Sequence, residues 1–445
     1  MLVLKFGGTS VGSVENMTHV KNIINDGTKK VVVLSAMSGT TNALVEISEH
    51  IRLKERDSAH VLIQQLASSY QNTIEQLLND SALINESQEY VNKVFAGLIE
   101  LVNSEHTTLI YNQIVAQGEL LSTFLFSRFL MQEGINAALL PALDFMRIDN
   151  NDEPDSFYIK QSLNRILNEN SEADIYITQG FICLDVQGNI SNLQRGGSDY
   201  TASIVGAAIE ANEVQIWTDI DGFHNNDPRF VENTTAISNI SFDEAAELAY
   251  FGAKILHPQT VIPVKDLNIP VRLKNTMSPD SYGTLITHHV HGEGIKAIAA
   301  KDGIYAIKIK SARMLQAHGF LKKVFEIFEK YETSIDMITT SEIAVSLTID
   351  NPLHLDVIVE ELEKVASVDV DQGMSIVCLV GNNIIYHQDT PHLFQVLQDV
   401  PVRMISYGGS NNNISLLINT DQKLNTLQKL QGYVFESQLE KAVAY

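Results

Sequence analysis

The sequence predicts an α/β protein, with a largely parallel sheet sandwiched by helices and followed by two smaller ferredoxin-like units. Three observations support this prediction. Over the first 287 residues, short apolar runs rich in β-branched residues alternate with helical patterns, which is typical of parallel sheets. Composition changes at about residue 288, where a short linker begins. From there, an imperfect repeat of strand, helix, strand, strand and helix fills the chain.

The first part begins with a strand at residues 1–4 and a helix at 14–26. The β-branched run 31–34 predicts a buried strand. Residues 42–132 contain no proline and repeat apolar residues at helical spacing, so they predict several helices. Further elements are predicted as strands at 137–140, 174–178 and 213–218, helices at 157–168, 199–211 and 241–252, and closing strands within 271–287.

The second part begins after a linker that carries His288, His289 and His291. These histidines lack a carboxylate or thiol at regular spacing, so we interpret them as linker residues and expect no metal site in the protein. The first repeat predicts strands at 304–309 and 343–349, a helix at 319–331 and an extended stretch at 334–340. The second predicts strands at 375–380, 402–407 and 413–418 and a helix at 391–398.

Length, charge and cysteine content limit the classes of function. A chain of 445 residues with 44% hydrophobic residues should form two or three domains with substantial cores. Its net charge of −23 argues against partners such as nucleic acid or an anionic membrane. Cys183 and Cys378 lie in or beside apolar runs, which predicts buried free thiols. With no signal peptide and no run of about 20 apolar residues, we expect a soluble cytoplasmic protein.

The first candidate site is the glycine-rich turn at residues 5–12. Lys5 ends the first strand, and Gly7 and Gly8 follow it. Glycines let backbone amides approach an anion closely, and a lysine adds positive charge, so the turn suits a polyphosphate. It is not a Walker A loop, because the lysine precedes the glycines. Many turns of this kind bind nothing, so the other residues must supply the rest of a site.

A second candidate is the segment 195–199, Arg-Gly-Gly-Ser-Asp. Ser198 is a good N-cap, and Asp199 falls in the first helical turn. An ordinary helix start would need no more than these two residues. Arg195 and the double glycine go beyond a cap, which favours a site for a carboxylate or phosphate.

Other charged residues have an ordinary structural interpretation beside the functional one. Glu119 could be a solvated side chain, but its apolar neighbours favour burial and a role in holding an ammonium group. Lys254 could simply stabilise a helix C-terminus, and Arg229 could be a surface arginine. Together with Lys5 and Asp199, these residues fit phosphoryl transfer, which depends mainly on positioning and charge stabilisation. No nucleophile–base pair stands out, which suits an acceptor that is already ionised at neutral pH.

With these motifs in order along the chain, the sequence resembles the aspartokinases of the amino-acid kinase family. The matching stretches are residues 5–11 (KFGGTSV), 117–120 (QGEL), 179–182 (QGFI), 195–201 (RGGSDYT), 217–219 (WTD), 227–229 (DPR) and 251–258 (FGAKILHP). The tail resembles paired ACT domains, and the whole pattern is most similar to the monofunctional, lysine-sensitive type. The resemblance implies a catalytic domain at 1–287 and a regulatory region at 288–445. It places the first ACT unit at about 301–373 and the second at 374–445 with strand 294–300.

The resemblance also implies the reaction ATP + L-aspartate → 4-phospho-L-aspartate + ADP, with Mg²⁺ on the nucleotide. This would be the first step of lysine, threonine and methionine biosynthesis. The implied catalytic residues are Lys5, Lys254 and Asp199, the last orienting the lysines. The implied aspartate-binding residues are Arg195 for the α-carboxylate and Glu119 for the ammonium group, with Thr41, Phe181 and Ser198 lining the pocket. The implied nucleotide-binding residues are Lys5, Gly7, Gly8, Thr218, Asp219, His224, Arg229 and Lys254; relatives usually carry tyrosine at the position of His224.

A lysine effector between the ACT units of two subunits, and hence a homodimer, is a further implication. The matching residues are Met314, Gly319, Phe320, Leu321, Asp336, Thr340, Ser341 and Glu342. Asp336 and Glu342 could instead be ordinary carboxylates at strand ends, and Ala317 stands where such relatives commonly have serine. Threonine, or no effector at all, stays open.

Two other functions also stay open at this point. One is a different carboxylate or carbamate kinase of the same fold, which gives no reason for the tail or for the FGAKILHP stretch. The other is a non-catalytic amino-acid sensor. A sensor would tolerate loss of the charged site residues, yet all of them are present in the sequence.

Overall fold

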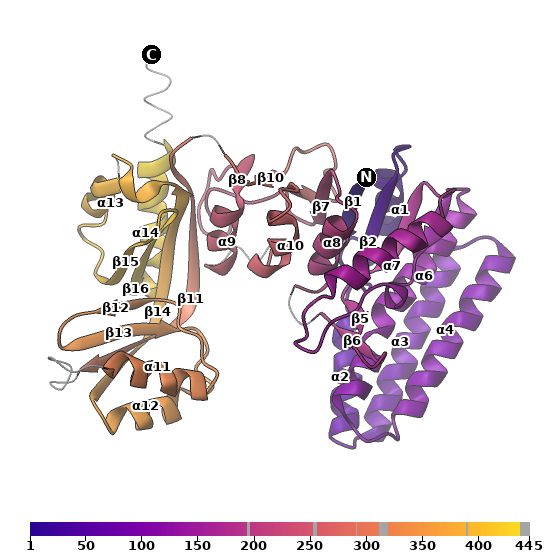
Figure 1. The fold of residues 1–445 in the computed structure, drawn as a ribbon, viewed down its shortest axis with the longest axis horizontal. Helices are drawn as coiled ribbons and strands as arrows, with labels where there is room; N and C mark the ends of the chain where they lie inside the picture. The colour runs from indigo at the N-terminus through magenta and orange to yellow at the C-terminus, as the bar shows by residue number, and fades with distance from the viewer. Residues whose placement is uncertain (194–195, 252–255, 291, 311–318, 389, 437–445) are drawn as a thin grey trace, which may run out of the picture. The chain divides into compact units, whose positions relative to one another are not determined.

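The computed structural model describes residues 1–193, 196–251, 256–290, 292–310, 319–388 and 390–436. The chain forms two compact units (Figure 1). The first contains Met1–Phe223, Ser238–Phe242 and Leu256–His288. The second contains His224–Ile237, Asp243–Ile255 and His289–Tyr445.

The first unit is built on an eight-stranded sheet in the order β3-β4-β2-β1-β7-β9-β10-β8. Every neighbouring pair is parallel except β9 with β10, so the predicted largely parallel sheet is confirmed. The strands are β1 (Leu2–Phe6), β2 (Lys30–Leu34), β3 (Ala137–Leu139), β4 (Ile175–Gln179), β7 (Glu213–Thr218), β8 (Asn239–Ser241), β9 (Val271–Asn275) and β10 (Thr284–Thr287). All five residues of both β2 and β4 are buried, as expected for central strands covered on both faces.

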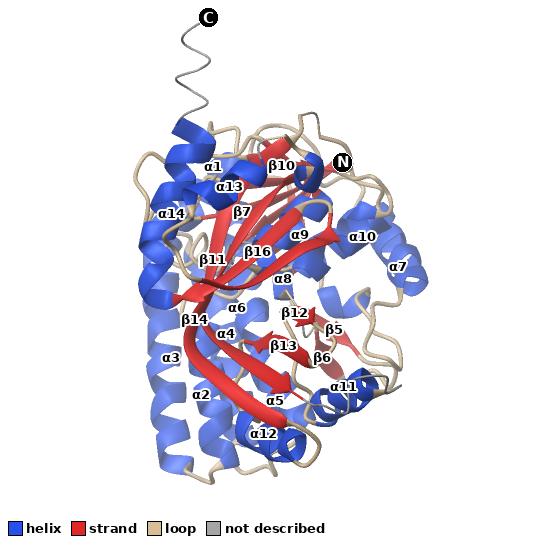
Figure 2. Ribbon diagram, turned by 90° about the vertical axis from the view of Figure 1, so that its left-hand side faces the viewer, coloured by secondary structure: helices blue, strands red, loops and turns tan. Residues whose placement is uncertain are grey.

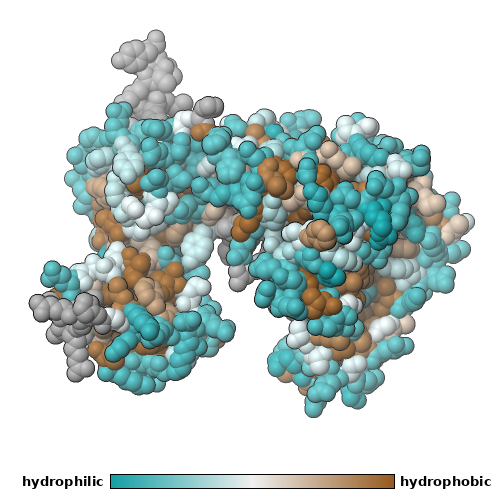
Figure 3. Space-filling view, viewed as in Figure 1, coloured by the Kyte–Doolittle hydropathy of each residue, from teal (hydrophilic) through white to brown (hydrophobic). Residues whose placement is uncertain are grey.

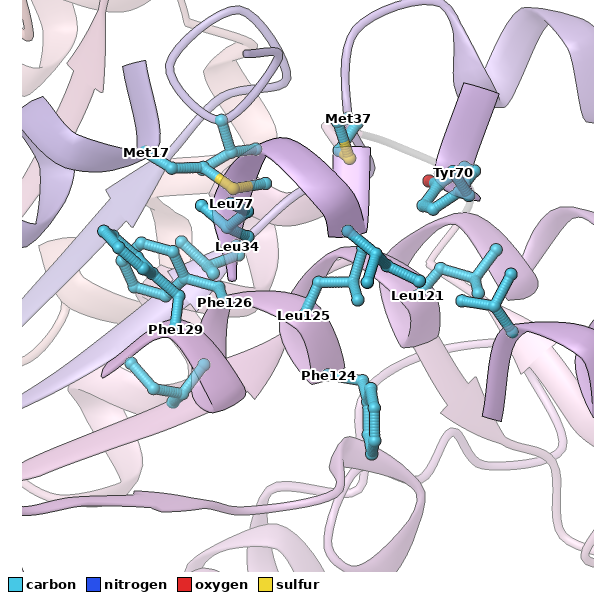
Figure 4. Close-up of a cluster of buried hydrophobic side chains, with 14 of the residues drawn as sticks. Met17, Leu34, Met37, Tyr70, Leu77, Leu121, Phe124, Leu125, Phe126 and Phe129 are labelled. Atoms are coloured by element: carbon cyan, nitrogen blue, oxygen red, sulfur yellow. The ribbon is translucent and has the colours of Figure 1, made fainter. Parts of the chain in front are cut away.

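Helices surround this sheet in the first unit. They are α1 (Val14–Ile24), α2 (Thr40–Arg52), α3 (Arg56–Leu77), α4 (Ser81–Leu101), α5 (Thr108–Val115), α6 (Gln117–Gln132), α7 (Ser156–Glu169), α8 (Gly197–Ala208) and α10 (Ile262–Lys265). The proline-free stretch therefore forms helices α2 to α6, as predicted. Figure 4 shows part of the core, where Met17 and Leu34 meet Phe126 and Phe129 of α6. A small hairpin, β5 (Ile182–Leu184) with β6 (Ile190–Asn192), was not predicted.

The helical stretch Thr108–Gln132 has the length and apolar composition of a membrane-crossing helix. However, 78% of its apolar window is buried inside the protein, as is common for a core helix. The described chain contains no second stretch of this kind.

The second unit contains a six-stranded sheet in the order β12-β13-β11-β14-β16-β15, with every pairing antiparallel. Its strands are β11 (Gly294–Lys310), β12 (Ile338–Thr340), β13 (Ala344–Ile349), β14 (Ser367–Asn382), β15 (Val402–Ser410) and β16 (Asn413–Asn419). The helices packed with it are α11 (Phe320–Lys330), α12 (Leu355–Glu363), α13 (Thr390–Val396) and α14 (Lys423–Gln431). The predicted repeat of strands and helices is present in both halves of this sheet.

The two long strands β11 and β14 run through both halves of the sheet (Figure 2). Gly294 pairs with Asn382 at one end, and Lys310 pairs with Ser367 at the other. The register shifts between Lys301 and Ile304, next to Gly303 at φ 77°. Each half has its own apolar core, so one continuous sheet carries two hydrophobic clusters.

The second unit also includes two segments that come before residue 288 in sequence. Asn226 donates hydrogen bonds to the Leu427 carbonyl and to Gln431, and Val231 lies in the core of the β14–β16 half. Helix α9 (Phe242–Tyr250) contributes Asp243 onward. The compact units therefore differ from the predicted domain 1–287 in these segments, because side-chain contacts draw them to the second sheet. The domain boundary itself stays a prediction.

Both cysteines are free and buried, as predicted. Burial raises the pKa of the Cys183 thiol to about 12 and raises that of Cys378 as well. The two thiols are therefore kept protonated and have the character of core residues.

Candidate functional site

The candidate site lies at one edge of the parallel sheet of the first unit. Strands β1, β2, β4, β7 and β9 all run in the same direction, so their carboxyl ends share this edge. Lys5 lies in register with Val33 on one side and Ile216 on the other. Ligands of open α/β sheets bind at this edge, and the sequence motifs of β1, β4 and β7 end there.

Lys5 forms an ion pair with Asp199, and the ammonium nitrogen lies 2.7 Å from a carboxylate oxygen. The exposed fractions of the two side chains are 13% and 18%, so water screens the pair only partly. Asp199 lies in the first turn of α8, where the helix dipole stabilises a carboxylate. Helix α8 packs beside β1 (Figure 1), which brings the two residues together across nearly 200 positions of sequence.

The glycines after Lys5 are required by close backbone contacts. A Cβ on Gly8 would lie 2.9 Å from the Ala36 carbonyl oxygen, and the Ser38 amide donates a 3.1 Å hydrogen bond to the Gly8 carbonyl. A Cβ on Gly7 would lie 3.4 Å from the Lys5 ammonium nitrogen. The loop after β1 and the loop after β2 are thus held together beside the lysine. Any side chain at Gly7 would stand against the ammonium group.

Glu119 is a buried carboxylate with one oxygen unused. Only 4% of the residue is exposed, and its Oε1 accepts a 3.2 Å hydrogen bond from the Ala36 amide. Its Oε2 is buried and has no hydrogen-bond partner among the described residues. Burial raises the pKa of Glu119 to about 7. A positive or hydrogen-donating ligand group would satisfy the free oxygen, which agrees with the sequence interpretation of this residue.

The start of α6 is shaped to bring Glu119 to the loop after β2. A Cβ on Gly118 would lie 2.8 Å from the Ala36 Cβ, so only glycine allows this approach. Thr41 lies in the first turn of α2 and is exposed, whereas Thr40 beside it is buried and bonds to Tyr70. The assignment of Thr41 to the pocket therefore stays a prediction.

Ser198 and Phe181 come together at the start of α8. Gly180 approaches so closely that a Cβ there would lie 2.2 Å from the Ser198 Oγ. Phe181 has φ 66°, a strained value for a non-glycine residue, and its amide donates to the Thr201 hydroxyl at 2.9 Å. Strained backbone of this kind is common at functional sites.

The prediction that Ser198 caps α8 is wrong. The helix begins at Gly197, its N-cap is Gly196 with φ 71°, and no side chain caps it. Ser198 lies inside the first turn, and its hydroxyl is hydrogen-bonded by Ser35 at 2.9 Å. The two glycines take positive φ, so the turn forms earlier than the serine would suggest.

Beyond the glycine turn, the described residues predicted for the nucleotide lie in two places. Thr218 ends β7 and Asp219 follows it, and the Thr218 hydroxyl donates to Asp219 at 3.0 Å. His224 and Arg229 belong to the second unit, where the Arg229 guanidinium is 76% exposed and pairs with Asp227. The remaining predicted residues Arg195 and Lys254, and Met314 of the effector set, lie outside the described residues.

The predicted effector residues lie in the second unit. Gly319 is the N-cap of α11 with φ 84°, and Phe320 and Leu321 begin that helix. Thr340 ends β12, and Ser341 and Glu342 follow it as exposed residues. Asp336 differs from them, because its side chain is only 1% exposed and bonds to Tyr250 and Lys301.

Sequence reasoning missed several residues that shape these sites. Ser35 and Ala36, in the loop after β2, contact Ser198 and Glu119 respectively. The small-residue turn at 35–41 was visible in the sequence, and its place after a parallel strand could have assigned it to the same edge. Tyr250 and Lys301 gave no such signal, because their contact with Asp336 depends on tertiary structure.

Comparison with protein families gives two matches. Residues 1–275 match the model described as the amino acid kinase family. Residues 377–432 match a model described as an ACT domain. The first match includes the whole candidate site of the first unit, and the second includes β16 and α14.

Individual relatives agree with these matches over nearly the whole chain. The lysine-sensitive aspartokinase 3 of Escherichia coli is 33% identical over 98% of this chain and 99% of its own. A crystal structure of E. coli aspartokinase III in complex with lysine and aspartate, in the T-state, has a TM-score of 0.82 at 32% identity, covering 98% of this chain and 99% of that one. A structure of the same relative with aspartate and ADP, in the R-state, also has a TM-score of 0.82 at 32% identity, covering 98% of this chain and 100% of that one.

Proposed function

The chain belongs to the aspartokinases of the amino acid kinase family, and on that premise we propose that it transfers the γ-phosphoryl group of ATP to the β-carboxylate of L-aspartate. It is an aspartate kinase by family, a phosphotransferase with a carboxyl group as acceptor. The products are 4-phospho-L-aspartate and ADP. The observation that carries the proposal is the ion pair of Lys5 and Asp199 beside the glycine turn.

In this mechanism Lys5 stabilises the charge of the phosphoryl group in transfer. Asp199 holds the ammonium group at 2.7 Å and fixes its direction, so little reorganisation is needed during the reaction. The acceptor carboxylate is ionised at neutral pH and needs no general base. Asp199 is therefore assigned to positioning rather than to proton transfer. By its motif, Lys254 provides the second positive charge.

Aspartate recognition is assigned to two charged groups. The buried free oxygen of Glu119 is suited to the substrate ammonium group, because an ammonium donor would satisfy it and favour its ionised form. Arg195 is assigned to the α-carboxylate by its motif, as a guanidinium pairs well with a carboxylate. The walls of this pocket are assigned to Ser198 in the first turn of α8, Phe181 after β4 and Thr41 on α2.

Nucleotide binding is assigned to the loop after β1 and the end of β7. Gly7 and Gly8 leave room for phosphate close to the backbone beside Lys5, and on the adjacent strand Thr218 ends β7 and Asp219 follows it. His224 and Arg229 are assigned to the nucleotide by motif alone. Mg²⁺ commonly binds through phosphates and one or two carboxylates, and it would neutralise phosphate charge. The described residues hold no group of three His, Cys, Asp or Glu side chains suited to a metal, so nucleotide phosphates are its expected main ligands.

An ADP-release assay with L-aspartate, L-glutamate and N-acetylglutamate tests this function. We expect turnover with aspartate that requires Mg²⁺. Turnover with glutamate but not aspartate would support another carboxylate kinase instead. Absence of turnover with all three, together with intact lysine binding, would support the non-catalytic sensor.

Feedback inhibition by lysine is proposed for the second unit. The E. coli relative is called lysine-sensitive, and one of its structures contains lysine. Asp336 is the buried carboxylate of the predicted effector set, which suits a cationic ligand. Adding L-lysine or L-threonine to the assay separates these two effectors. Inhibition by threonine alone would overturn lysine as the effector.

A homodimer through the ACT region is also proposed. The edge strands β12 and β15 lie next to each other and carry exposed apolar residues, including Ile338, Ile405 and Tyr407. Figure 3 shows apolar surface on this unit. Open strand edges with apolar side chains are typical protein contacts. Light scattering of the full chain tests the dimer, and we further propose a cytoplasmic location.

A further inference from the structure

Helix α9 contacts the second sheet through one polar face. Glu244, Glu247 and Tyr250 are spaced three residues apart, so they share a side of the helix. Each contacts a residue of the second unit: the Lys296 ammonium lies 2.9 Å from Glu244, the Asn413 amide donates to Glu247 at 2.6 Å, and the Tyr250 hydroxyl donates to Asp336 at 2.8 Å. Helix α9 is thus positioned by hydrogen bonds and an ion pair, and a charged ligand bound beside these groups can alter them.

The last of these contacts joins α9 to the proposed effector carboxylate. Asp336 Oδ1 accepts hydrogen bonds from both Tyr250 and Lys301, the latter at 3.1 Å. Asp336 Oδ2 is buried and has no hydrogen-bond partner among the described residues. A buried carboxylate oxygen without a donor is unfavourable, so the site favours one more cationic or hydrogen-donating group.

Lys301 already occupies this site with an ammonium group of the chain itself. Its nitrogen lies 2.8 Å from Asp350 as well as 3.1 Å from Asp336, and it lies over the Tyr250 ring at 4.5 Å from the centroid. Two carboxylates and an aromatic face are the surroundings that an alkylammonium ligand requires. In the free protein Lys301 thus makes with Asp336 Oδ1 the kind of ammonium–carboxylate contact that an amine effector would make on binding, while Oδ2 has no hydrogen-bond partner among the described residues.

We propose that Lys301 is an internal competitor of the effector's ammonium group at Asp336, and that Tyr250 links the occupancy of Asp336 to helix α9. This inference rests on the proposed role of Asp336 in effector recognition. When a second ammonium group binds Asp336, repulsion between the two cations moves Lys301 toward Asp350. The Tyr250 hydroxyl then either shares Asp336 Oδ1 as its acceptor with the effector or loses its hydrogen bond to Asp336.

The linked element leads toward the catalytic residues in sequence. Tyr250 is the last residue of α9, and Lys254 follows four positions later. A change at the Tyr250 hydroxyl thus acts on the end of the helix that precedes a proposed phosphoryl-binding lysine. Two-state coupling of this kind needs a ligand that interacts differently with the two states, and competition with Lys301 provides that difference.

The competition is tested by lysine binding to the full-length protein, measured by calorimetry. Lys301→Met removes the internal ammonium group, and we expect its Kd for L-lysine to fall by about 5-fold or more. Lys310→Met, at the exposed end of the same strand, is the matched control and should bind as the wild type does. Equal or weaker binding by Lys301→Met would overturn the proposal.

Loss of Lys301 leaves the buried carboxylate of Asp336 without its cation, which destabilises the folded protein. Lys301→Gln keeps a hydrogen-bond donor and serves as the second variant. Its melting temperature should rise more on adding L-lysine than that of the wild type, because the ligand replaces the missing charge. A smaller rise, or none, would contradict the competition.

The link is tested with Tyr250→Phe, which removes only the hydroxyl. Its Kd for L-lysine should stay within about 2-fold of the wild type, whereas the factor by which saturating aspartate changes that Kd should fall by about 5-fold. Tyr386→Phe, at a residue that is 74% exposed, is the control. An unchanged factor in Tyr250→Phe would remove Tyr250 from the coupling.

Failure of this inference can be distinguished from failure of the proposed kinase function. If the protein phosphorylates aspartate but neither the wild type nor the Lys301 variants bind lysine, the inference is overturned and the kinase stands. If no aspartate is phosphorylated but Lys301→Met still binds lysine more tightly than the wild type, the kinase function fails and the competition at Asp336 is supported.

Discussion

The ammonium group of Lys5 and the carboxylate of Asp199 meet at 2.7 Å, one from the end of β1 and the other from the first turn of α8. Because this cation is held in place before the reaction, removing it should cost transition-state stabilisation. We expect Lys5→Ala to lower kcat by at least about 100-fold in the ADP-release assay. Lys29→Ala, one residue before β2, is the control, and a near-normal rate for Lys5→Ala would exclude Lys5 from the transition state.

Asp199 is proposed to act through Lys5, and on that assignment the two substitutions should not be additive. Asp199→Asn keeps the shape of the side chain but loses its charge, and kcat should fall less than in Lys5→Ala. The double variant should be no slower than Lys5→Ala alone, since the orienting group has nothing left to orient. Rates from the four proteins of this cycle provide the test. Full additivity would show that Asp199 has a separate role, such as proton transfer.

The buried Glu119 should make stability depend on pH in the absence of ligand. Its pKa is about 7 in the folded protein and 4.5 in the reference state, so folding favours the protonated form. The contribution is fully present below pH 4.5 and is lost as pH rises through 7, a change of about 3 kcal/mol. Relative to Glu119→Gln, the wild type should therefore lose this amount between pH 4.5 and 8 in urea unfolding.

Exposed Glu75→Gln is the matched control for this measurement, and it should follow the wild type at both pH values. On the proposed assignment of Glu119 to the substrate ammonium group, aspartate in the buffer should restore part of the lost stability of the wild type at pH 8. A pH-independent difference between the wild type and Glu119→Gln would contradict the raised pKa.

The contact of Gly180 with Ser198 should be intolerant of any side chain. A Cβ at Gly180 would lie 2.3 Å from the Ser198 Cβ and 2.8 Å from its Cα, which forces the start of α8 to move. Gly180→Ala should cost about 1–3 kcal/mol and raise KM for aspartate. Gly97→Ala, on α4 with nothing within 4 Å, should instead be neutral or stabilising by up to about 1 kcal/mol. Equal stability of the two variants would contradict the contact.

The fold was largely predictable because its strands are either fully buried or clearly bounded. The predicted strand at 213–218 has the bounds of β7, and helix α1 ends two residues before its prediction. The β5–β6 hairpin was missed because each of its strands has three residues. That is too short for an alternation of apolar and polar residues to be recognised. The continuous course of β11 was also missed by periodicity, because it depends on pairing with β14.

The candidate site was predictable to the extent that charge and glycine patterns identify it. Of the residues predicted for this site, Lys5 and Asp199 are in direct contact, and Glu119 accepts a hydrogen bond from Ala36 in the loop after β2. The helix start at Gly197 was misjudged because glycines at positive φ replaced a side-chain cap. The contact of Asp336 with Tyr250 joins residues from different elements, and no local pattern carries that information.

The course of β11 has a consequence for how the protein is made. The half of β11 that begins at Gly294 pairs with the end of β14 at Asn382. During synthesis this half therefore stays unpaired until the chain has been extended to Asn382. Pairings so distant in sequence are slow to form, and unpaired strand edges are prone to association with other chains. The growing chain therefore exposes an unpaired strand edge, which can associate with other chains, near the beginning of β11 in the second unit. Aggregation during rapid expression, and any need for chaperones, should therefore originate at β11 rather than in the first unit.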